Sequence, residues 1–263
     1  MKVYTKVNDA LNELSKTIYT HPISVHPEVG EILYSLARNL RPETVVEIGS
    51  FIGYSSICFA QAIEDNNQKD GVVYAIDLFQ PHPKNPLFLK QDIDNPLQLA
   101  ENNAKKAGLE HRIVFMKGYS HELAKDLLPK IGAIDILFID GDHTYKGALS
   151  DYNNYHTKVK KHGLIIFHDI YPKRCGWWGP RILIDTLKRG IRRRYEILEI
   201  DTPDGFGLAI CKKLFNGAGE IGSNKLIEFL RKAYSYYKQG GRWEELYQAN
   251  KSGRGIKDFL SKI

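Results

Sequence analysis

Short β-branched runs alternate with amphipathic stretches along the middle of this chain. Strand-like runs lie at 45–48, 71–77, 112–117, 134–139 and 163–167, and a closing hairpin is predicted at 195–200 and 206–211. Helical spacing predicts helices at 54–63, 96–108, 120–128, 145–159 and 181–190. Alternating strands and helices are typical of a mostly parallel sheet covered on both faces. We expect a doubly wound α/β fold, with a seven-stranded sheet in the order 3-2-1-4-5-7-6.

The pattern divides the chain into three parts. Residues 1–40 form a predicted N-terminal helical extension, residues 41–213 the α/β domain, and residues 214–263 a C-terminal helical extension rich in polar and aromatic residues. Three roles are open for the last part, which could pack on the domain, join a partner subunit in a homo-oligomer, or cover the site.

Composition narrows the class of protein only slightly. The chain has 263 residues, a net charge of +6 and three cysteines far apart in the sequence. Its basic runs, Lys158–Lys161, Lys188–Arg194 and the tail after Lys225, are interpreted as solvated helix faces or helix ends, which makes nucleic acid a disfavoured partner. No apolar run has the length of a membrane span or a signal peptide, and the cysteines suggest no disulfide framework. We expect a cytoplasmic protein.

A tight turn is predicted where the first strand meets the first helix of the sheet domain. The stretch Thr44-Val-Val-Glu47-Ile-Gly49-Ser-Phe-Ile-Gly53-Tyr-Ser55 joins a buried run to a helical pattern through two glycines. Glycine lets the backbone approach a ligand closely, and a helix start offers free N–H groups. The glycine spacing differs from the Gly-x-Gly-x-x-Gly dinucleotide fingerprint. An ordinary strand-to-helix turn is the alternative interpretation.

Polar residues also stand where the later strands end, at the edge where ligands of such sheets bind. Asp77 closes the second strand, where its carboxylate could accept both hydroxyls of a ribose or cap a loop. The third strand runs into Gly118-Tyr119-Ser120, which either faces an adenine ring or simply begins a helix.

Acids and imidazoles gather at the ends of the fourth and fifth strands. Asp140 follows one strand, and His168 and Asp169 follow the other. If these strands are neighbours about 4.8 Å apart, the three side chains meet and suit a divalent cation. His143 lies three residues after Asp140 and is a candidate general base. The alternative is that the acids cap the next helix and His143 lies on the surface.

These residues together resemble the catechol O-methyltransferase-like, metal-dependent class I methyltransferases, which use S-adenosylmethionine (SAM). The pair Ile139-Asp-Gly-Asp-His-Thr-Tyr145 and Ile165-Ile-Phe-His-Asp169 is most similar to a branch with cephalosporin-biosynthesis and macrolide-sugar O-methyltransferases. The resemblance implies SAM contacts from Glu47, Gly49, Ser50, Phe51, Gly53, Tyr54 and Ser55 around methionine and ribose, from Asp77 at the ribose hydroxyls, and from Tyr119 and Ser120 at adenine. Leu78, Gly118 and Asp140 complete the expected cofactor-binding set.

The chain departs from the catechol enzymes at two places. They use an Asp-Asn pair after the fifth strand and a lysine base, where this chain has His168-Asp169 and His143. With Asp140, His168 and Asp169 as expected metal ligands and His143 as expected base, the resemblance implies metal-assisted O-methylation of a small-molecule hydroxyl on a sugar, phenol or natural product. Mg²⁺ or Mn²⁺ is the expected cation. Trp177 and Trp178 could wall such a substrate or pack on the next helix.

Three other functions remain open from the sequence. A nucleic-acid or metal-independent methyltransferase fits the basic charge, although the Asn/Asp-Pro-Pro-Tyr pattern of many base methyltransferases is absent after the fourth strand. A non-catalytic protein that binds SAM or a nucleotide would need Glu47, Gly49 and Asp77 alone. A nicotinamide-dependent oxidoreductase is disfavoured by the glycine spacing.

Overall fold

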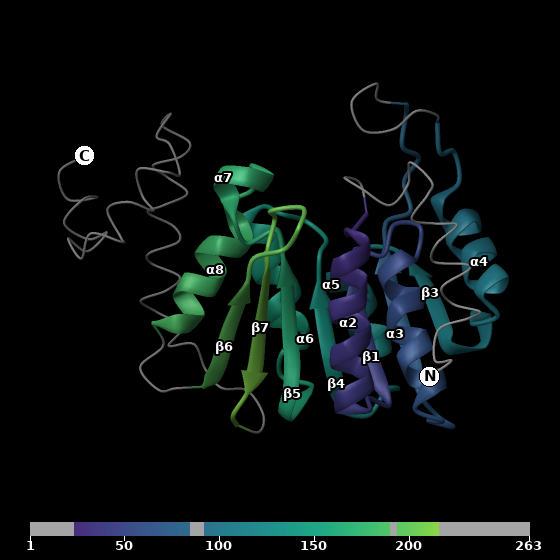
Figure 1. Ribbon diagram of the computed structural model, residues 1–263, viewed down its shortest axis with the longest axis horizontal. Coiled ribbons are helices and arrows are strands. Elements are labelled where there is room, and N and C mark those ends of the chain that lie inside the picture. The colour runs from purple at the N-terminus through teal and green to yellow at the C-terminus, as the bar shows by residue number, and fades with distance from the viewer. Residues whose placement is uncertain (1–23, 85–91, 190–193, 216–263) are drawn as a thin grey trace.

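The computed structural model describes residues 24–84, 92–189 and 194–215 and contains one seven-stranded sheet. Its order is β3-β2-β1-β4-β5-β7-β6, as predicted, and only β7 runs against its neighbours (Figure 1). The strands are β1 (Thr44–Ile48), β2 (Val72–Asp77), β3 (Ile113–Lys117), β4 (Ile134–Ile139), β5 (Val159–His168), β6 (Tyr195–Ile200) and β7 (Leu208–Lys213).

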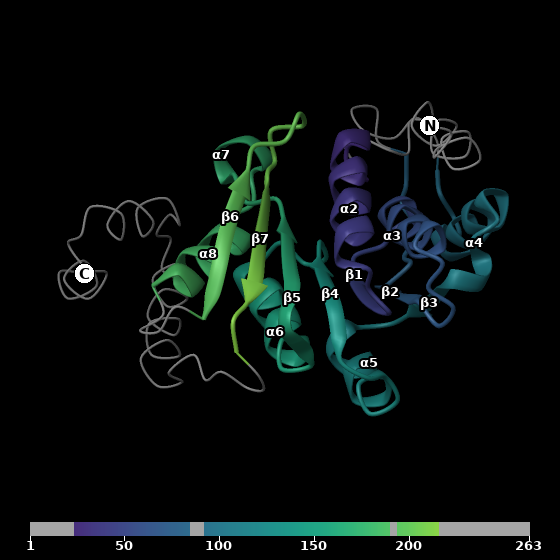
Figure 2. The same cartoon turned by 60° about the horizontal axis from the view of Figure 1, so that its bottom comes forward.

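Helices cover both faces of this sheet, as Figure 2 shows from a second direction. The described helices are α2 (Pro27–Leu40), α3 (Tyr54–Asp65), α4 (Pro96–Ala107), α5 (Ser120–Leu127), α6 (Tyr145–Tyr155), α7 (Pro172–Cys175) and α8 (Gly179–Lys188), with a 3-10 turn, η1 (Glu110–Arg112), before β3. Helices α2 and α3 pack together over one face, and α6 packs with α5 and α8 over the other.

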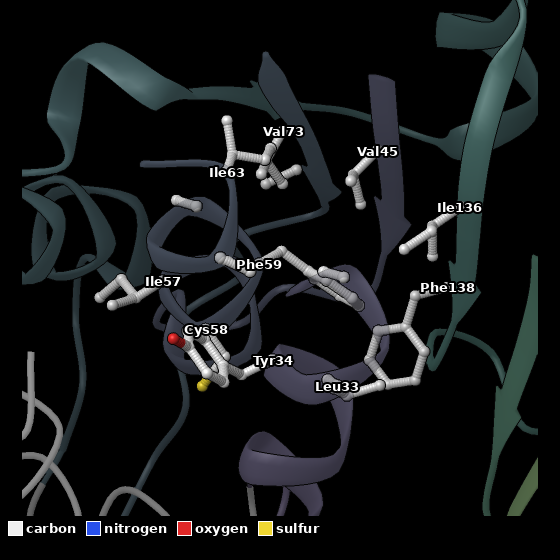
Figure 3. Packing of buried hydrophobic residues seen from close by; sticks show 14 of the residues in the cluster. Leu33, Tyr34, Val45, Ile57, Cys58, Phe59, Ile63, Val73, Ile136 and Phe138 are labelled. Carbon is white, nitrogen blue, oxygen red and sulfur yellow. The ribbon is translucent and has the colours of Figure 1, made fainter. Parts of the chain in front are cut away.

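The core consists of one apolar layer on each side of the sheet. Successive strand residues point to opposite faces, so Val45 packs under α2 and α3 while Val46 packs under α5 and α6. On the first side Phe59 of α3 meets Phe138 of β4, with ring centroids 5.9 Å apart (Figure 3). Strands β1 and β4 are buried on both faces at the centre of the sheet, and Asp140, which follows β4, lies at the sheet edge.

Helix α2 shares the core of the sheet domain although it precedes the first strand. Val29, Leu33 and Ala37 are fully buried against α3, and the Tyr34 hydroxyl donates to Asp65 at 2.7 Å. Helix α2 and the sheet therefore form one packed unit. The predicted domain boundary at residue 40 stays a prediction. Residues 1–23 and 216–263, which hold the rest of both predicted extensions, lie outside the described residues.

The boundary between α6 and β5 differs from the prediction. The helix ends at Tyr155, and β5 begins at Val159, whereas helical spacing predicted a helix through Val159. Val159 pairs with Ile134 of β4, and the buried ammonium of Lys213 donates to the carbonyls of His156 and Val159 at 2.7 Å each. Partners from distant strands therefore end the helix. The basic run Lys158–Lys161 consequently enters a strand rather than a helix face.

Within the described part of the chain, no helix is both long and apolar enough to cross a membrane. All three cysteines are free thiols, and Cys58 and Cys211 are buried in the two core layers.

Candidate active site

The turn after β1 brings the backbones of two strands into close contact. Gly49 has a φ of 91°, and a side-chain carbon built on it would lie 2.1 Å from the carbonyl oxygen of Asp140. The Gly49 N–H donates to Ile76 at 2.8 Å, and the Asp140 N–H donates to Ile48 at 2.8 Å. Glycine is therefore required at position 49 by conformation and by space. Gly53, with φ 83°, starts α3.

Glu47 is fully buried at the end of β1, below the turn. One carboxylate oxygen accepts from the Ser56 hydroxyl of α3, and the other, Oε1, has no hydrogen-bond partner within the described part of the chain. Burial raises the pKa of Glu47 to about 7, although the hydroxyls of Ser55 and Ser56 oppose the shift. The buried Ser50 hydroxyl likewise finds no hydrogen-bond partner in residues 24–84, 92–189 and 194–215. These unsatisfied polar atoms beside the glycine turn fit a polar ligand such as the amino-acid part of SAM.

The carboxylate of Asp77 is held in place at the end of β2. Its Oδ2 accepts from the Phe51 N–H at 2.9 Å, and its Oδ1 accepts from the Phe79 N–H at 2.6 Å. Two backbone donors from different loops therefore fix its orientation. Each oxygen keeps a second acceptor position, so the geometry suits the paired hydroxyls of a ribose. Leu78 follows directly and is half-buried.

The segment after β3 is anchored to α6. Ser120 donates its hydroxyl to Asp151, and its carbonyl accepts from the Tyr155 hydroxyl at 2.7 Å. Burial raises the pKa of Asp151 to about 6, against the hydrogen bond from Ser120. Tyr119 is about half exposed (52%) and lies beside His121, while Gly118 has φ 154°. The Ser120–Asp151 contact was not predicted, because Asp151 reads as an ordinary helix position.

Some expected cofactor residues contribute backbone rather than side chain to this edge. The ring of Tyr54 packs in the core against Gly30 of α2, and burial raises its pKa above the ordinary value. Phe51 adopts φ 47° and places its ring 4.9 Å from that of His82. Ser55 is buried, and its hydroxyl opposes the rise in the pKa of Glu47. The tertiary structure therefore leaves the Tyr54 side chain to the core, and only its N–H at the start of α3 remains for a cofactor.

Two acids and two histidines meet where β4 and β5 end, and we call Asp140, His143, His168 and Asp169 the acid–imidazole cluster. The Nε2 atom of His143 lies 2.7 Å from Asp169 Oδ2 and 3.3 Å from Asp140 Oδ1. The Nδ1 atom of His168 lies 3.3 Å from Asp140 Oδ1 and 3.3 Å from Asp169 Oδ1. The adjacent pairing of β4 and β5 brings these residues together, as the sheet order predicted.

Contacts among the acids and imidazoles of the cluster shift the pKa values of Asp140, His143 and His168 toward their charged forms. Burial raises the pKa of Asp140, but the charge of His168 and the hydrogen bond from His143 outweigh it and lower that pKa to about 2. Burial lowers the pKa of His143, yet bonds to Asp140 and Asp169 raise it to about 10. The same carboxylates and Asp204 raise the pKa of His168 well above its ordinary value against burial. Any cation that binds here must displace such a proton.

The donor set suits a divalent cation. Ligand atoms of Asp140, His143 and Asp169 all lie within 4.8 Å of one another, and the buried Oδ1 of Asp169 has no hydrogen-bond partner among the residues that the structure describes. Carboxylates and imidazoles at such separations can share one ion, as Mn²⁺ and related metals prefer. The sequence predicted His168 as the third ligand, whereas this compact group contains His143. Both assignments stay predictions.

Helix α7 and the turn after it place an aromatic residue beside the cluster. Trp177 stacks on His143, with centroids 5.5 Å apart and an interplanar angle of 22°, and it stays half exposed (50%). Gly179 allows this approach, because a side-chain carbon there would lie 2.3 Å from the His143 carbonyl oxygen. The short α7 was not predicted, although Pro172 and Gly176 at its two ends are typical helix boundaries.

The chain matches known proteins over most of its sheet domain. Residues 46–170 match the model of a methyltransferase domain. A caffeoyl-CoA O-methyltransferase from Stellaria longipes is 27% identical over 239 residues, covering 81% of this chain and 87% of that protein. Tricin synthase 2 from Oryza sativa is 25% identical and covers 81% of this chain and 72% of the relative.

Solved structures share the fold. The O-methyltransferase TomG from Streptomyces achromogenes, in complex with SAM, superposes with a TM-score of 0.62 at 19% identity. It covers 79% of this chain and 90% of its own. The likeness extends over most of both chains and shows that they share a fold.

Proposed function

Because the chain belongs to the class I SAM-dependent O-methyltransferases, we propose that it methylates a hydroxyl of a small molecule at the acid–imidazole cluster. One observation carries this proposal. The glycine turn expected to bind SAM and the cluster expected to bind the acceptor meet at Asp140, whose carbonyl contacts Gly49 and whose carboxylate faces His143 and His168. Cofactor and acceptor would therefore lie side by side, and alignment of reacting groups supplies much of the rate of such reactions.

We propose that Asp140, His168 and Asp169 hold a divalent cation, with Mg²⁺ and Mn²⁺ as candidates. Such an ion would act as a Lewis acid and lower the pKa of the acceptor hydroxyl. The residues of the chain bind and orient both reactants. Asp77 would bind the ribose of SAM, and the Gly49 turn would leave room for its methionine part. The two acids of the cluster would lie beside the acceptor oxygen.

His143 is the candidate base for the acceptor hydroxyl. Its raised pKa means that it carries a proton at neutral pH while the two carboxylates face it unshielded. A cation bound to those two carboxylates would lower the pKa of His143 and free its Nε2 to accept a proton. His143 therefore serves as a base only when a cation is bound to Asp140 and Asp169.

His143→Gln should lower kcat by about 100-fold, which is the usual contribution of a positioned base. The affinity for S-adenosylhomocysteine should stay unchanged, because no expected cofactor contact is removed. Steady-state kinetics at saturating SAM and acceptor test this expectation. His111→Gln is the matched control, since His111 is exposed and pairs only with Glu64 among the described residues. A His143→Gln enzyme with the parental kcat would place the base elsewhere.

Trp177 is proposed as a wall for the acceptor, because an exposed indole beside the cluster favours a planar ring or the apolar face of a sugar. Trp177→Ala should raise the acceptor KM by about 3- to 10-fold, since aromatic pairs contribute about 0.5–1.5 kcal/mol. The KM for SAM should not change, and Trp177→Phe should restore most of the loss. Equal acceptor KM values for the parent and Trp177→Ala would remove this role.

The proposed reaction is tested by incubating the protein with methyl-labelled SAM and caffeoyl-CoA, the acceptor for which a relative is named, beside simple catechols and sugars. Reactions would be run with chelator and with added Mg²⁺ or Mn²⁺. Label on an oxygen of any acceptor, restored by metal after chelation, supports the proposal. Undiminished transfer after exhaustive chelation would leave a metal-independent methyltransferase. Failure to bind SAM or S-adenosylhomocysteine would contradict the proposal entirely.

Location and assembly stay predictions. The free cysteines fit the expected reducing cytoplasm. A homo-oligomer is expected only as one role for the C-terminal segment, which lies outside the described residues.

A further inference from the structure

The loop between β6 and β7 reaches the acid–imidazole cluster from the β7 side of β5, opposite to β4. Strand β7 pairs with β5, and Leu208, its first residue, lies opposite His168. This register brings the preceding loop over the end of β5. Asp204 in this loop is almost fully buried at its side chain. A carboxylate buried here needs a partner, because burial of an unpaired charge is costly.

His168 and Asp204 face each other through two atoms that have no hydrogen-bond partner among the described residues. The Nε2 of His168 lies 3.5 Å from Oδ2 of Asp204, and both atoms are buried. The opposite nitrogen of the same ring, Nδ1, lies 3.3 Å from Asp140 and 3.3 Å from Asp169. The imidazole of His168 therefore stands between one acid of the loop and two acids of the cluster.

The loop holds Asp204 in the orientation that this contact requires. Oδ1 of Asp204 accepts from the Thr202 hydroxyl and from the Phe206 N–H at 2.9 Å, and the Thr202 hydroxyl in turn accepts from the Gly207 N–H at 2.7 Å. Gly205 and Gly207 adopt φ values of 77° and 80°, which close the loop tightly. With Oδ1 used by the loop, Oδ2 is left to face His168.

We propose that Asp204 is a positioning residue that accepts the Nε2 proton of His168 and thereby presents Nδ1 of His168 to Asp140 and Asp169. A carboxylate behind a histidine commonly fixes the ring orientation and the tautomer in this way. Nδ1 then either donates to the two cluster acids or, once deprotonated, joins them as a cation ligand. The cation role rests on the proposed function, whereas the placement of the Nε2 proton does not.

Asp204→Asn separates this role from a merely structural one. The amide oxygen can keep both loop bonds, because Thr202 and Phe206 are donors there and require an acceptor. The amide NH₂ then faces Nε2 of His168 and requires that nitrogen to accept, so the ring carries its proton on Nδ1 alone. The fold should persist while the presentation of Nδ1 is lost.

The experiment compares the parent, Asp204→Asn and the matched control Asp201→Asn by two readouts. Asp201 lies in the same loop but is exposed and pairs with Arg174. The first readout is ¹⁵N–¹H correlation of the histidine rings in metal-free protein, with the His168 signals assigned from their loss in His168→Gln. The second is Mn²⁺ affinity by paramagnetic titration. Thermal unfolding reports whether each variant is folded.

We expect the parent and Asp201→Asn to carry a proton on Nε2 of His168, and Asp204→Asn to lose it. Mn²⁺ affinity should fall about 10- to 100-fold in Asp204→Asn alone, as for other partners behind a metal ligand. An unprotonated Nε2 in the parent, or a parental tautomer in folded Asp204→Asn, would overturn the proposal. If Asp204→Asn unfolds, Asp204→Glu replaces it in the experiment. Loss of the parental His168 tautomer in Asp204→Glu supports the positioning role. The parental tautomer together with the parental Mn²⁺ affinity in Asp204→Glu opposes it.

The two proposals fail in different ways. If the parent binds no Mn²⁺, the metal-assisted reaction is contradicted, but the ring spectra still decide whether Asp204 holds His168. If Mn²⁺ binds equally well to the parent and to a tautomer-shifted Asp204→Asn, His168 is not a ligand and the positioning role toward the cation is overturned.

Discussion

Asp140→Asn should slow methyl transfer more than any other change considered for this site and leave the fold intact. Asp140 contacts both histidines of the acid–imidazole cluster, and its carboxylate is one of the two expected to hold a cation. Lewis-acid stabilisation contributes several kcal/mol, and each ~1.4 kcal/mol is about tenfold in rate, so kcat should fall by about 1000-fold. Removal of the carboxylate charge also leaves two protonated imidazoles without one of their shared partners.

Initial rates with saturating SAM, with and without added Mn²⁺, measure this effect. Asp142→Asn is the matched control, because Asp142 lies two residues away in the same loop, is exposed and accepts from the Thr144 N–H. Calorimetry should show that Asp140→Asn still binds S-adenosylhomocysteine, because the backbone of Asp140 keeps its contact with Gly49. A rate equal to that of Asp142→Asn would sink the metal-assisted mechanism.

Asp77→Ala should weaken cofactor binding by about 10- to 100-fold. The carboxylate of Asp77 is oriented by two backbone donors and offers its remaining acceptor positions to a ribose. A hydrogen bond to a charged group contributes about 1.5–3 kcal/mol, which converts to a loss of this size. The loss also leaves the Phe51 and Phe79 N–H groups without their acceptor, so the loops that flank the cofactor would be less well held.

Calorimetric titration with S-adenosylhomocysteine measures the dissociation constant directly, without turnover. Asp70→Ala is the control, since Asp70 is an exposed acid that precedes β2 at its opposite end. The kcat of Asp77→Ala at saturating SAM should stay close to that of the parent, because no residue of the acid–imidazole cluster changes. An unaltered dissociation constant in Asp77→Ala would show that Asp77 does not hold the ribose.

Local sequence determined the identity of most elements and the residues at their ends. Strand β4 was predicted with its observed bounds, because the mostly apolar run Ile134–Ile139 has the length of a buried strand and ends at the polar turn that begins with Asp140. The glycine turn after β1 was recognisable because Gly49 and Gly53 occupy positive-φ positions that other residues rarely adopt. Asp77, Asp140, His168 and Asp169 followed, since every parallel strand delivers its terminal residue to the same edge.

Only the tertiary structure decided which of these groups touch, and what stands behind them. The start of β5 depends on Ile134 and Lys213, which are distant in sequence from Val159. Asp204 reads as part of a hairpin turn, Pro203-Asp-Gly205, and gains its contact with His168 only through the pairing of β7 with β5. Local periodicity encodes the type of element, because it reflects burial on one face. Contacts between loops depend on strand order and register, which no short stretch of sequence contains.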